Sequence, residues 1–186
     1  DLETLGRTLI SEICDTMHFE RAALFRKAEE ASDYLLAAQH GLGKELADLR
    51  QRSDHPVVQW LVHWERPLHE YELDTLPQFR GLWGQEKEDL DSLRAQLFVP
   101  LLVKGDLVGI LAVGPKVSGS RYTLDDEITL STLANQTAVA VENARLFAIT
   151  KARVDDLTAL QATGVQLVST RSLPAVLRVV AESGVR

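Results

Sequence analysis

Apolar positions follow two different periods along the chain, and these predict helices at both ends with strands between them. Residues 2–17 carry apolar side chains at intervals of three and four, which predicts a helix with one apolar stripe. The members of this stripe are Leu2, Leu5, Leu9, Ile13 and Met17. Two short apolar runs, 21–28 and 33–40, follow with a polar link between them, so we expect two strands there.

The middle of the chain mixes helical and extended signals. Ser53 and Asp54 are residue types that cap helix N-termini, so a helix is predicted from there to the residues before Pro67. Residues 67–72 are interpreted as an edge strand, because a proline cannot donate a hydrogen bond to a neighbouring strand. Residues 73–94 contain short helical pieces, glycines and a run of charges, which predicts a segment of helices and loops.

A β-hairpin follows this segment. Two runs rich in β-forming residues, 95–103 and 107–114, lie on either side of Lys104-Gly105-Asp106, a connection short enough to join antiparallel strands. Core positions on alternating faces of the hairpin are expected at Leu101, Val108, Ile110 and Leu111. Because neither strand alternates cleanly with charged residues, both faces of the sheet should be covered. Antiparallel strands, with helices at the two ends of the chain, favour an α+β fold.

The last helix has a clear start and no early stop. Thr123 is a good N-cap residue and Asp126 occupies the third helical position, a pattern close to a capping box. No proline follows until Pro174, so a helix is predicted from 124 to about 150, with an extension to about 169.

This helix carries more apolar surface than one sheet covers. One stripe can lie on the sheet, and it consists of Leu130, Leu133, Ala134, Ala138, Val141 and Ala148. Other apolar residues need a second cover, namely Val139, Leu146, Ile149, Val154, Leu157 and Leu160. Before residue 150 the cover is either the N-terminal helix or a second subunit. For the extension a second subunit is favoured, which predicts a homodimer joined by a coiled coil.

Composition narrows the class of protein. The chain of 186 residues has a formal net charge of −7, and its 20 Lys and Arg are scattered, which argues against nucleic-acid binding. Its apolar runs are too short to span a bilayer, so no membrane segment is expected. A single cysteine, Cys14, excludes an internal disulfide and favours a cytoplasmic location. The first residue is Asp rather than Met, so we expect a fragment of a longer protein.

Candidate catalytic and metal-binding residues do not form a recognisable set. His55, His63 and His69 are eight and six residues apart, spacings that fit neither a helical i, i+4 pair nor a zinc finger. Cys14 lies among apolar residues, which predicts a buried and inert thiol. We therefore expect no metal, no cofactor and no enzymatic activity.

The C-terminal half of the sequence resembles a known family. PLLVKGDLVGILAVG at 100–114 and RYTLDDEITLSTLANQTAVAVENARLF at 121–147 are similar to the closing hairpin and last helix of GAF domains. The resemblance extends more loosely over residues 1–150. It implies a central antiparallel sheet of about five or six strands. The N-terminal and long C-terminal helices would lie on one face of this sheet, and a variable cap of helices and loops on the other.

The resemblance also implies a domain organisation. Residues 1–150 would form the GAF-like sensory domain, and 151–171 a connecting signalling helix. Residues 172–186 would be the truncated start of a second, tandem repeat, in which Arg178 aligns with Arg7.

The function implied is that of a sensory or regulatory module in a bacterial signalling protein, with a sensor histidine kinase as one context. Such a module would bind a small molecule and pass a conformational signal through its C-terminal helix to an output domain of the same chain. The pocket would lie between sheet and cap, where the candidates are Trp60, Trp64, Phe79, Arg80, Trp83 and Phe98. Filling of the core is the alternative role for these aromatic residues.

Several specialised activities of the family lack their residues here. The sequence has neither the mid-domain cysteine of bilin-carrying relatives nor the several cysteines of methionine sulfoxide reductases. It also lacks the NKFDE-type motif of cyclic-nucleotide binders. The alternatives to a ligand sensor are a ligand-free dimerisation or interaction module and, less favoured, an enzyme.

Overall fold

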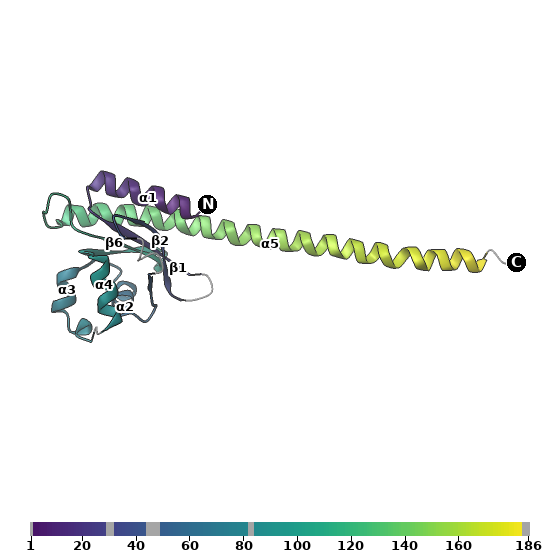
Figure 1. Ribbon diagram of the computed structural model, residues 1–186, viewed down its shortest axis with the longest axis horizontal. Coiled ribbons are helices and arrows are strands. Elements are labelled where there is room, and N and C mark those ends of the chain that lie inside the picture. Colours follow the sequence, from purple (N-terminus) through teal and green to yellow (C-terminus); the bar gives the residue numbers. More distant parts are fainter. Residues whose placement is uncertain (1, 29–31, 44–48, 82–83, 184–186) are drawn as a thin grey trace. The chain divides into compact units, whose positions relative to one another are not determined.

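The computed structural model describes residues 2–28, 32–43, 49–81 and 84–183. Contacts within the chain divide it into two units, Asp1–Ala144 and Arg145–Arg186. The first unit contains the sheet, the shorter helices and the beginning of the last helix (Figure 1). The second unit contains the remainder of that helix.

Six strands form one antiparallel sheet in the order β3-β2-β1-β6-β5-β4. The strands are β1 (Ala22–Lys27), β2 (Tyr34–His40), β3 (Arg50–Gln51), β4 (Leu68–His69), β5 (Leu97–Val103) and β6 (Asp106–Val113). The two central strands, β1 and β6, pair Ala22 with Val113 and Phe25 with Ile110. The predicted hairpin is therefore joined to the N-terminal strand pair along β1.

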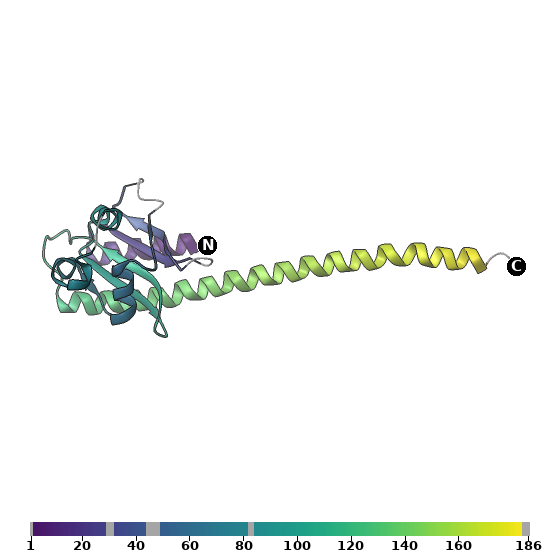
Figure 2. The same ribbon diagram turned by 90° about the horizontal axis from the view of Figure 1, so that it is seen from below.

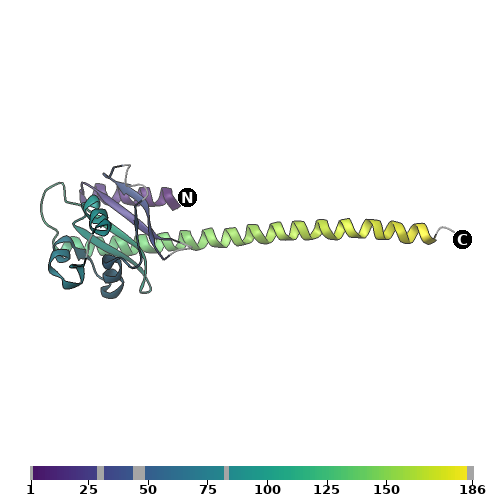
Figure 3. The same cartoon turned by 60° about the horizontal axis from the view of Figure 1, so that its bottom comes forward.

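Helices cover both faces of this sheet. They are α1 (Leu2–Met17), α2 (Pro56–Trp64), α3 (Glu70–Thr75), α4 (Gln85–Leu93) and α5 (Leu124–Ser183), with a 3-10 turn η2 (Pro77–Phe79) after α3. α1 and the beginning of α5 lie on one face of the sheet, and α2, α3 and α4 on the other (Figures 1, 2 and 3). This is the α+β arrangement that the sequence predicts.

Small and aliphatic side chains join α1 and α5 to their face of the sheet. Ile10 and Ile13 of α1 are buried together with Leu130, Ala134 and Ala138 of α5. The sheet contributes Leu24, Val99, Leu101, Leu111 and Val113 to this cluster. The alanines bring the helix close to the strands, because they add little bulk between backbone and sheet.

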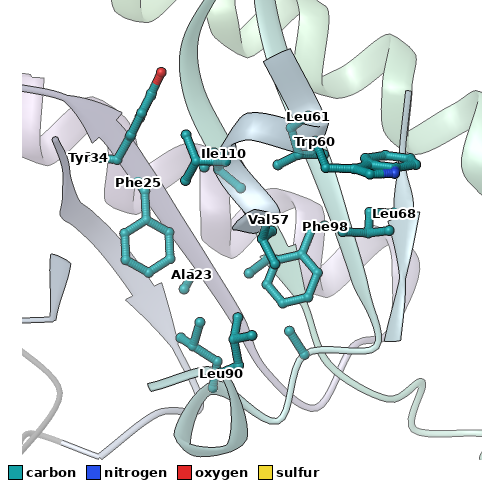
Figure 4. Close-up of a cluster of buried hydrophobic side chains, with 14 of the residues drawn as sticks. Ala23, Phe25, Tyr34, Val57, Trp60, Leu61, Leu68, Leu90, Phe98 and Ile110 are labelled. Atoms are coloured by element: carbon teal, nitrogen blue, oxygen red, sulfur yellow. The ribbon is translucent and has the colours of Figure 1, made fainter. Parts of the chain in front are cut away.

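The opposite face is buried beneath α2 and α4 by larger side chains (Figure 4). Val57 and Leu61 of α2 and Leu90 of α4 pack against Phe25 and Phe98 of the sheet. Further members are Tyr34, Trp60, Leu68, Phe79, Leu93, Leu107 and Ile110. Both faces of the sheet are therefore covered, as the lack of clean alternation in the hairpin predicts.

An irregularity in the hairpin changes which face one predicted core residue occupies. Leu101 pairs with Gly109, but the next residue, Leu102, pairs with Leu107, so Val108 is an extra residue on β6. Such a bulge interrupts the alternation of side chains. Val108 consequently packs on the α1 and α5 face, whereas Ile110 faces the cap.

The segment 67–72 departs from its predicted edge strand. Only Leu68 and His69 are extended, and α3 begins at Glu70. The cause is a helix cap, because the Glu72 carboxylate accepts a hydrogen bond from the His69 backbone N–H at 3.0 Å. The prediction of strand as far as residue 72 is therefore wrong.

The last helix starts where the sequence predicts and ends later. The Thr123 backbone N–H donates to the Asp126 carboxylate at 2.7 Å, and the Asp126 N–H donates to the Thr123 hydroxyl at 3.3 Å. α5 then continues beyond residue 169 and through Pro174 to Ser183. The two units divide within α5, between Ala144 and Arg145, and the predicted domain bounds of 1–150 and 151–171 stay predictions. The interpretation of 172–186 as the start of a second repeat stays a prediction.

Candidate functional site

A cleft lies between α3 and α4 on the cap side of the sheet. Its volume is about 610 Å³, and its wall residues are Glu70, Leu73, Asp74, Phe79, Arg80, Gly84, Lys87, Leu90 and Asp91. A second space of about 370 Å³ has Glu70, Leu73, Leu90 and Asp91 in common with the first and extends to Phe98 and Arg94. The two spaces therefore adjoin each other along the same pair of helices.

Helical spacing explains why these residues meet. Glu70, Leu73 and Asp74 occupy positions i, i+3 and i+4 of α3 and so share one face of that helix. Lys87, Leu90 and Asp91 have the same spacing on α4. Each helix thus presents one leucine between charged residues to the cleft.

The cleft combines an apolar floor with a charged rim. Phe79 and Leu90 are buried and Leu73 is half-buried, so apolar surface lies at its base. The rim residues are exposed and carry both signs of charge: Glu70, Asp74, Arg80, Lys87 and Asp91. The site is therefore open to solvent along its rim.

The structure separates the aromatic residues that the sequence groups as pocket candidates. Phe79 and Arg80 line the larger space, and Phe98 lines the adjoining one. Trp60 is instead buried in the cap-side core (Figure 4). The guanidinium of the exposed Arg66 lies 4.4 Å from the ring centre of Trp60. The side chain of Trp64 is 55% exposed. Trp83 lies outside the described residues.

Sequence reasoning missed the helical walls of the cleft. It predicts helices and loops over 73–94 without placing a helix at 85–93, and it interprets 67–72, which includes the start of α3, as a strand. The usable signal was the spacing of Lys87, Leu90 and Asp91, which places a leucine and two charges on one helical face.

His55 is a buried histidine at the N-terminus of α2. Its Nδ1 accepts a hydrogen bond from the Val57 backbone N–H at 3.2 Å, and its Nε2 is buried without a hydrogen-bond partner. Burial is the dominant influence and lowers the pKa of His55, although the nearby carboxylate of Glu86 acts in the opposite direction. The neutral ring is therefore the form that the folded domain prefers.

Acidification is expected to destabilise the domain through His55. Because the folded-state pKa is below the usual value of 6.5, the unfolded chain binds more protons as the pH falls below that value. The contribution of His55 is present above about pH 6.5 and is lost at lower pH, with a slope of at most about 1.4 kcal/mol per pH unit. Urea unfolding between about pH 8 and pH 5 measures this slope. His55→Asn keeps a capping side chain without a titrating ring and should give a flatter profile, whereas an equal slope would contradict the assignment.

A second histidine joins the cap to α5. The Nε2 of His69 lies 2.9 Å from Oε1 of Glu127, which belongs to the first part of α5. His69 is also the residue that caps α3, and its ring stacks on Tyr71 with centres 4.8 Å apart. Over the described ranges, no three His, Cys, Asp or Glu side chains gather as a set of metal ligands.

The residues predicted for the signalling helix differ in exposure. Val139, in the first unit, is 51% exposed. In the second unit Leu146, Val154 and Leu157 are exposed and Ile149 is partly exposed. The side chain of Leu160 lies outside the described side chains. Within the part of the chain that the structure describes, no helix has the length and apolar character needed to cross a bilayer.

The fold and the cleft define an α+β domain whose sheet has paired terminal helices on one face and a helical cap on the other. The family model described as GAF domain matches residues 1–142. The chain therefore belongs to the GAF domain family, as the resemblance of its last hairpin and helix implies.

Solved structures share this fold at low sequence identity. A methyl-accepting chemotaxis protein fragment, residues 122 to 287, matches with a TM-score of 0.65 and 19% identity over 79% of this chain and 92% of that chain. The GAF domain of a phosphoenolpyruvate-protein phosphotransferase from Coxiella burnetii has a TM-score of 0.63 and 20% identity, covering 80% and 87% of the two chains. A domain of a putative two-component sensor histidine kinase from Sinorhizobium meliloti 1021 gives 0.56 and 17%, covering 81% and 97%. These likenesses establish the fold.

Proposed function

We propose that this chain is a non-catalytic sensory module that binds a small molecule in the cleft between α3 and α4. The binding state would pass through α5 to an output domain of the same cytoplasmic signalling protein, of which a sensor histidine kinase is one form. The observation that carries the proposal is the cleft of about 610 Å³ with its apolar floor and charged rim. The fold shared with a chemotaxis protein and a sensor histidine kinase supports the sensory context.

The dimensions and lining of the cleft suit an organic molecule with an apolar body and polar ends. Small-molecule sites typically have volumes of about 300–1,000 Å³ and are mostly apolar, with a few polar groups that orient the ligand. Here Leu73, Phe79 and Leu90 provide the apolar contact surface, while Arg80 and Lys87 provide charged donors.

A second candidate function is a ligand-free dimerisation module. Two observations favour it. The space between the sheet and α2 is filled by the domain's own side chains, and Leu146, Val154 and Leu157 are exposed on a helix with no described cover. A parallel pairing of two such helices would bury these residues in a coiled coil. The ligand sensor and the ligand-free module therefore differ in one testable respect, which is whether a ligand occupies the cleft.

Native mass spectrometry of the protein purified from its own host tests both candidates. We expect a bound mass in addition to the chain, because a ligand held by the cleft survives gentle purification when it dissociates slowly. Arg80→Ala combined with Lys87→Ala should remove that mass, since both side chains are exposed on the rim and their loss leaves the core intact. The same spectrum gives the number of subunits.

Arg52→Ala is the matched control for the cleft variant, because Arg52 is an exposed arginine paired with Asp54 away from the cleft. It should retain the bound mass. A spectrum of wild-type dimers without any added mass would favour the ligand-free module. Retention of the mass by the cleft variant would place the ligand elsewhere.

A further inference from the structure

The hydrogen bond between His69 and Glu127 connects the wall of the cleft to the start of α5. The two side chains meet at 2.9 Å and are 11% and 26% exposed, so bulk water and salt screen the pair only partly. His69 immediately precedes Glu70, the first cleft residue of α3. The contact therefore joins segments that are 58 residues apart in sequence.

We propose that the His69–Glu127 pair is the positioning contact through which the cleft controls α5. The inference rests on the proposed function for the identity of the cleft as the ligand site. His69 and Glu127 would not contact the ligand. They would instead transfer a displacement of α3 to the first turn of α5.

On the side of the cleft, two contacts fix His69 to α3. Its backbone N–H donates to the Glu72 carboxylate at 3.0 Å, and its ring stacks on Tyr71 at 4.8 Å with an interplanar angle of 23°. Glu72 is in turn held by Arg66 at 2.8 Å. Because Tyr71 and Glu72 both belong to the first turn of α3, the imidazole moves when that turn moves.

At the other end, Glu127 is fixed within the first turn of α5. Its backbone N–H donates to the Thr123 carbonyl oxygen at 3.1 Å. The adjacent Asp126 closes the helix cap with Thr123 and is also paired with Lys116. These contacts hold the first turn of α5 together. A displacement of the Glu127 carboxylate would therefore move the start of α5 and not the side chain alone.

The chemistry makes the contact sensitive to the position of α3. If α3 moves away, the largely buried His69 ring loses its hydrogen-bond partner and the Glu127 carboxylate returns to water. The free-energy cost of this separation is larger than that of separating an exposed pair. A ligand that binds two positions of α3 unequally would therefore shift the start of α5 through this contact.

Filling the cleft with a side chain tests the coupling without any ligand. Leu73→Trp places an indole in the cleft, and hydrogen exchange is measured at the amides of residues 124–130 in the purified chain. In the otherwise unaltered chain we expect this substitution to change the exchange rates about fivefold or more, the lower end of typical coupling between sites. In a chain that also carries Glu127→Ala the same substitution should leave those rates unchanged.

Lys116→Met is the matched control, because it removes an ion pair at the same helix start in which neither partner belongs to α3. It should speed exchange at 124–130, but Leu73→Trp should still act in its presence. Asp74→Trp fills the same cleft from an exposed position and replaces Leu73→Trp if circular dichroism shows that the latter is unfolded. Glu127→Gln, which keeps a hydrogen-bond acceptor, should retain part of the effect.

The inference is overturned if filling the cleft leaves residues 124–130 unaffected, or if it acts equally in the presence and absence of the Glu127 carboxylate. This outcome is independent of the proposed ligand, because no ligand is present in the measurement. Conversely, a cleft that binds no molecule from the host would remove the proposed function while leaving a measured coupling between α3 and α5 intact.

Discussion

Replacing Ile110 with alanine is expected to lower the free energy of unfolding by about 2–5 kcal/mol, the usual loss when a large buried aliphatic side chain is truncated. Ile110 is 2% exposed and lies on β6 between Phe25 of β1 and Pro100 of β5. Its side chain belongs to the cap-side core, where helices cover the sheet, so the space left behind cannot be filled by water without cost. Urea unfolding followed by circular dichroism measures the change.

Val108→Ala provides the comparison on the same strand. Val108 is only partly buried at the bulge, so its truncation should cost clearly less than that of Ile110. Equal losses at the two positions would contradict the placement of Ile110 in the core beneath the cap.

Replacing Gly41 with alanine is the second change for which we expect a large effect, a loss of about 2–5 kcal/mol. Gly41 follows β2 and has φ +68°, a conformation that side chains disfavour. A Cβ there would lie 2.2 Å from the Glu20 carbonyl oxygen and 3.2 Å from the Arg21 Cα. Since both are backbone atoms, relief requires the segment between α1 and β1 to move. Thermal and urea unfolding of the variant report the loss.

Gly119 separates the two contributions. It has φ +70°, but a Cβ built on it meets no atom within 4 Å. Gly119→Ala should therefore show only the backbone cost, about 1 kcal/mol. If both variants lost the same stability, the close approach at Gly41 would not be a determinant of the fold.

The parts of the fold that the sequence predicts are those with strong local signals. The hairpin and the start of α5 depend on a short turn and on the Thr123–Asp126 cap, and both lie where expected. Two features depend on contacts that no local pattern encodes. β3 has only two residues, and the bulge at Val108 shifts a single side chain to the other face. The prediction of a strand over 67–72 was wrong because it was based on Pro67. The structure instead forms a helix from Glu70, which the hydrogen bond from the His69 N–H to Glu72 caps.

The candidate site was predictable only in part, for a related reason. The family resemblance places a pocket between sheet and cap, and three of its candidate residues, Phe79, Arg80 and Phe98, lie at the cleft and the space beside it. Two other candidates do not line it: Trp60 is buried in the cap-side core, and Trp64, the last residue of α2, is 55% exposed. Of the charged walls of α3 and α4, the spacing of Lys87, Leu90 and Asp91 is the usable sequence signal, and an ordinary solvated helix can show the same spacing.

The strand order has a consequence for the way in which this domain is made. β1 gains its second neighbour only from β6, and Ala22 pairs with Val113, which is 91 residues later. During synthesis β1 and β2 therefore leave the ribosome well before the partner that completes the sheet. Until then one edge of β1 is unpaired, and exposed strand edges of this kind favour association between chains. Because non-local pairing slows folding, the centre of the sheet is expected to form only after β6 has been synthesised, although it contains side chains that are almost completely buried.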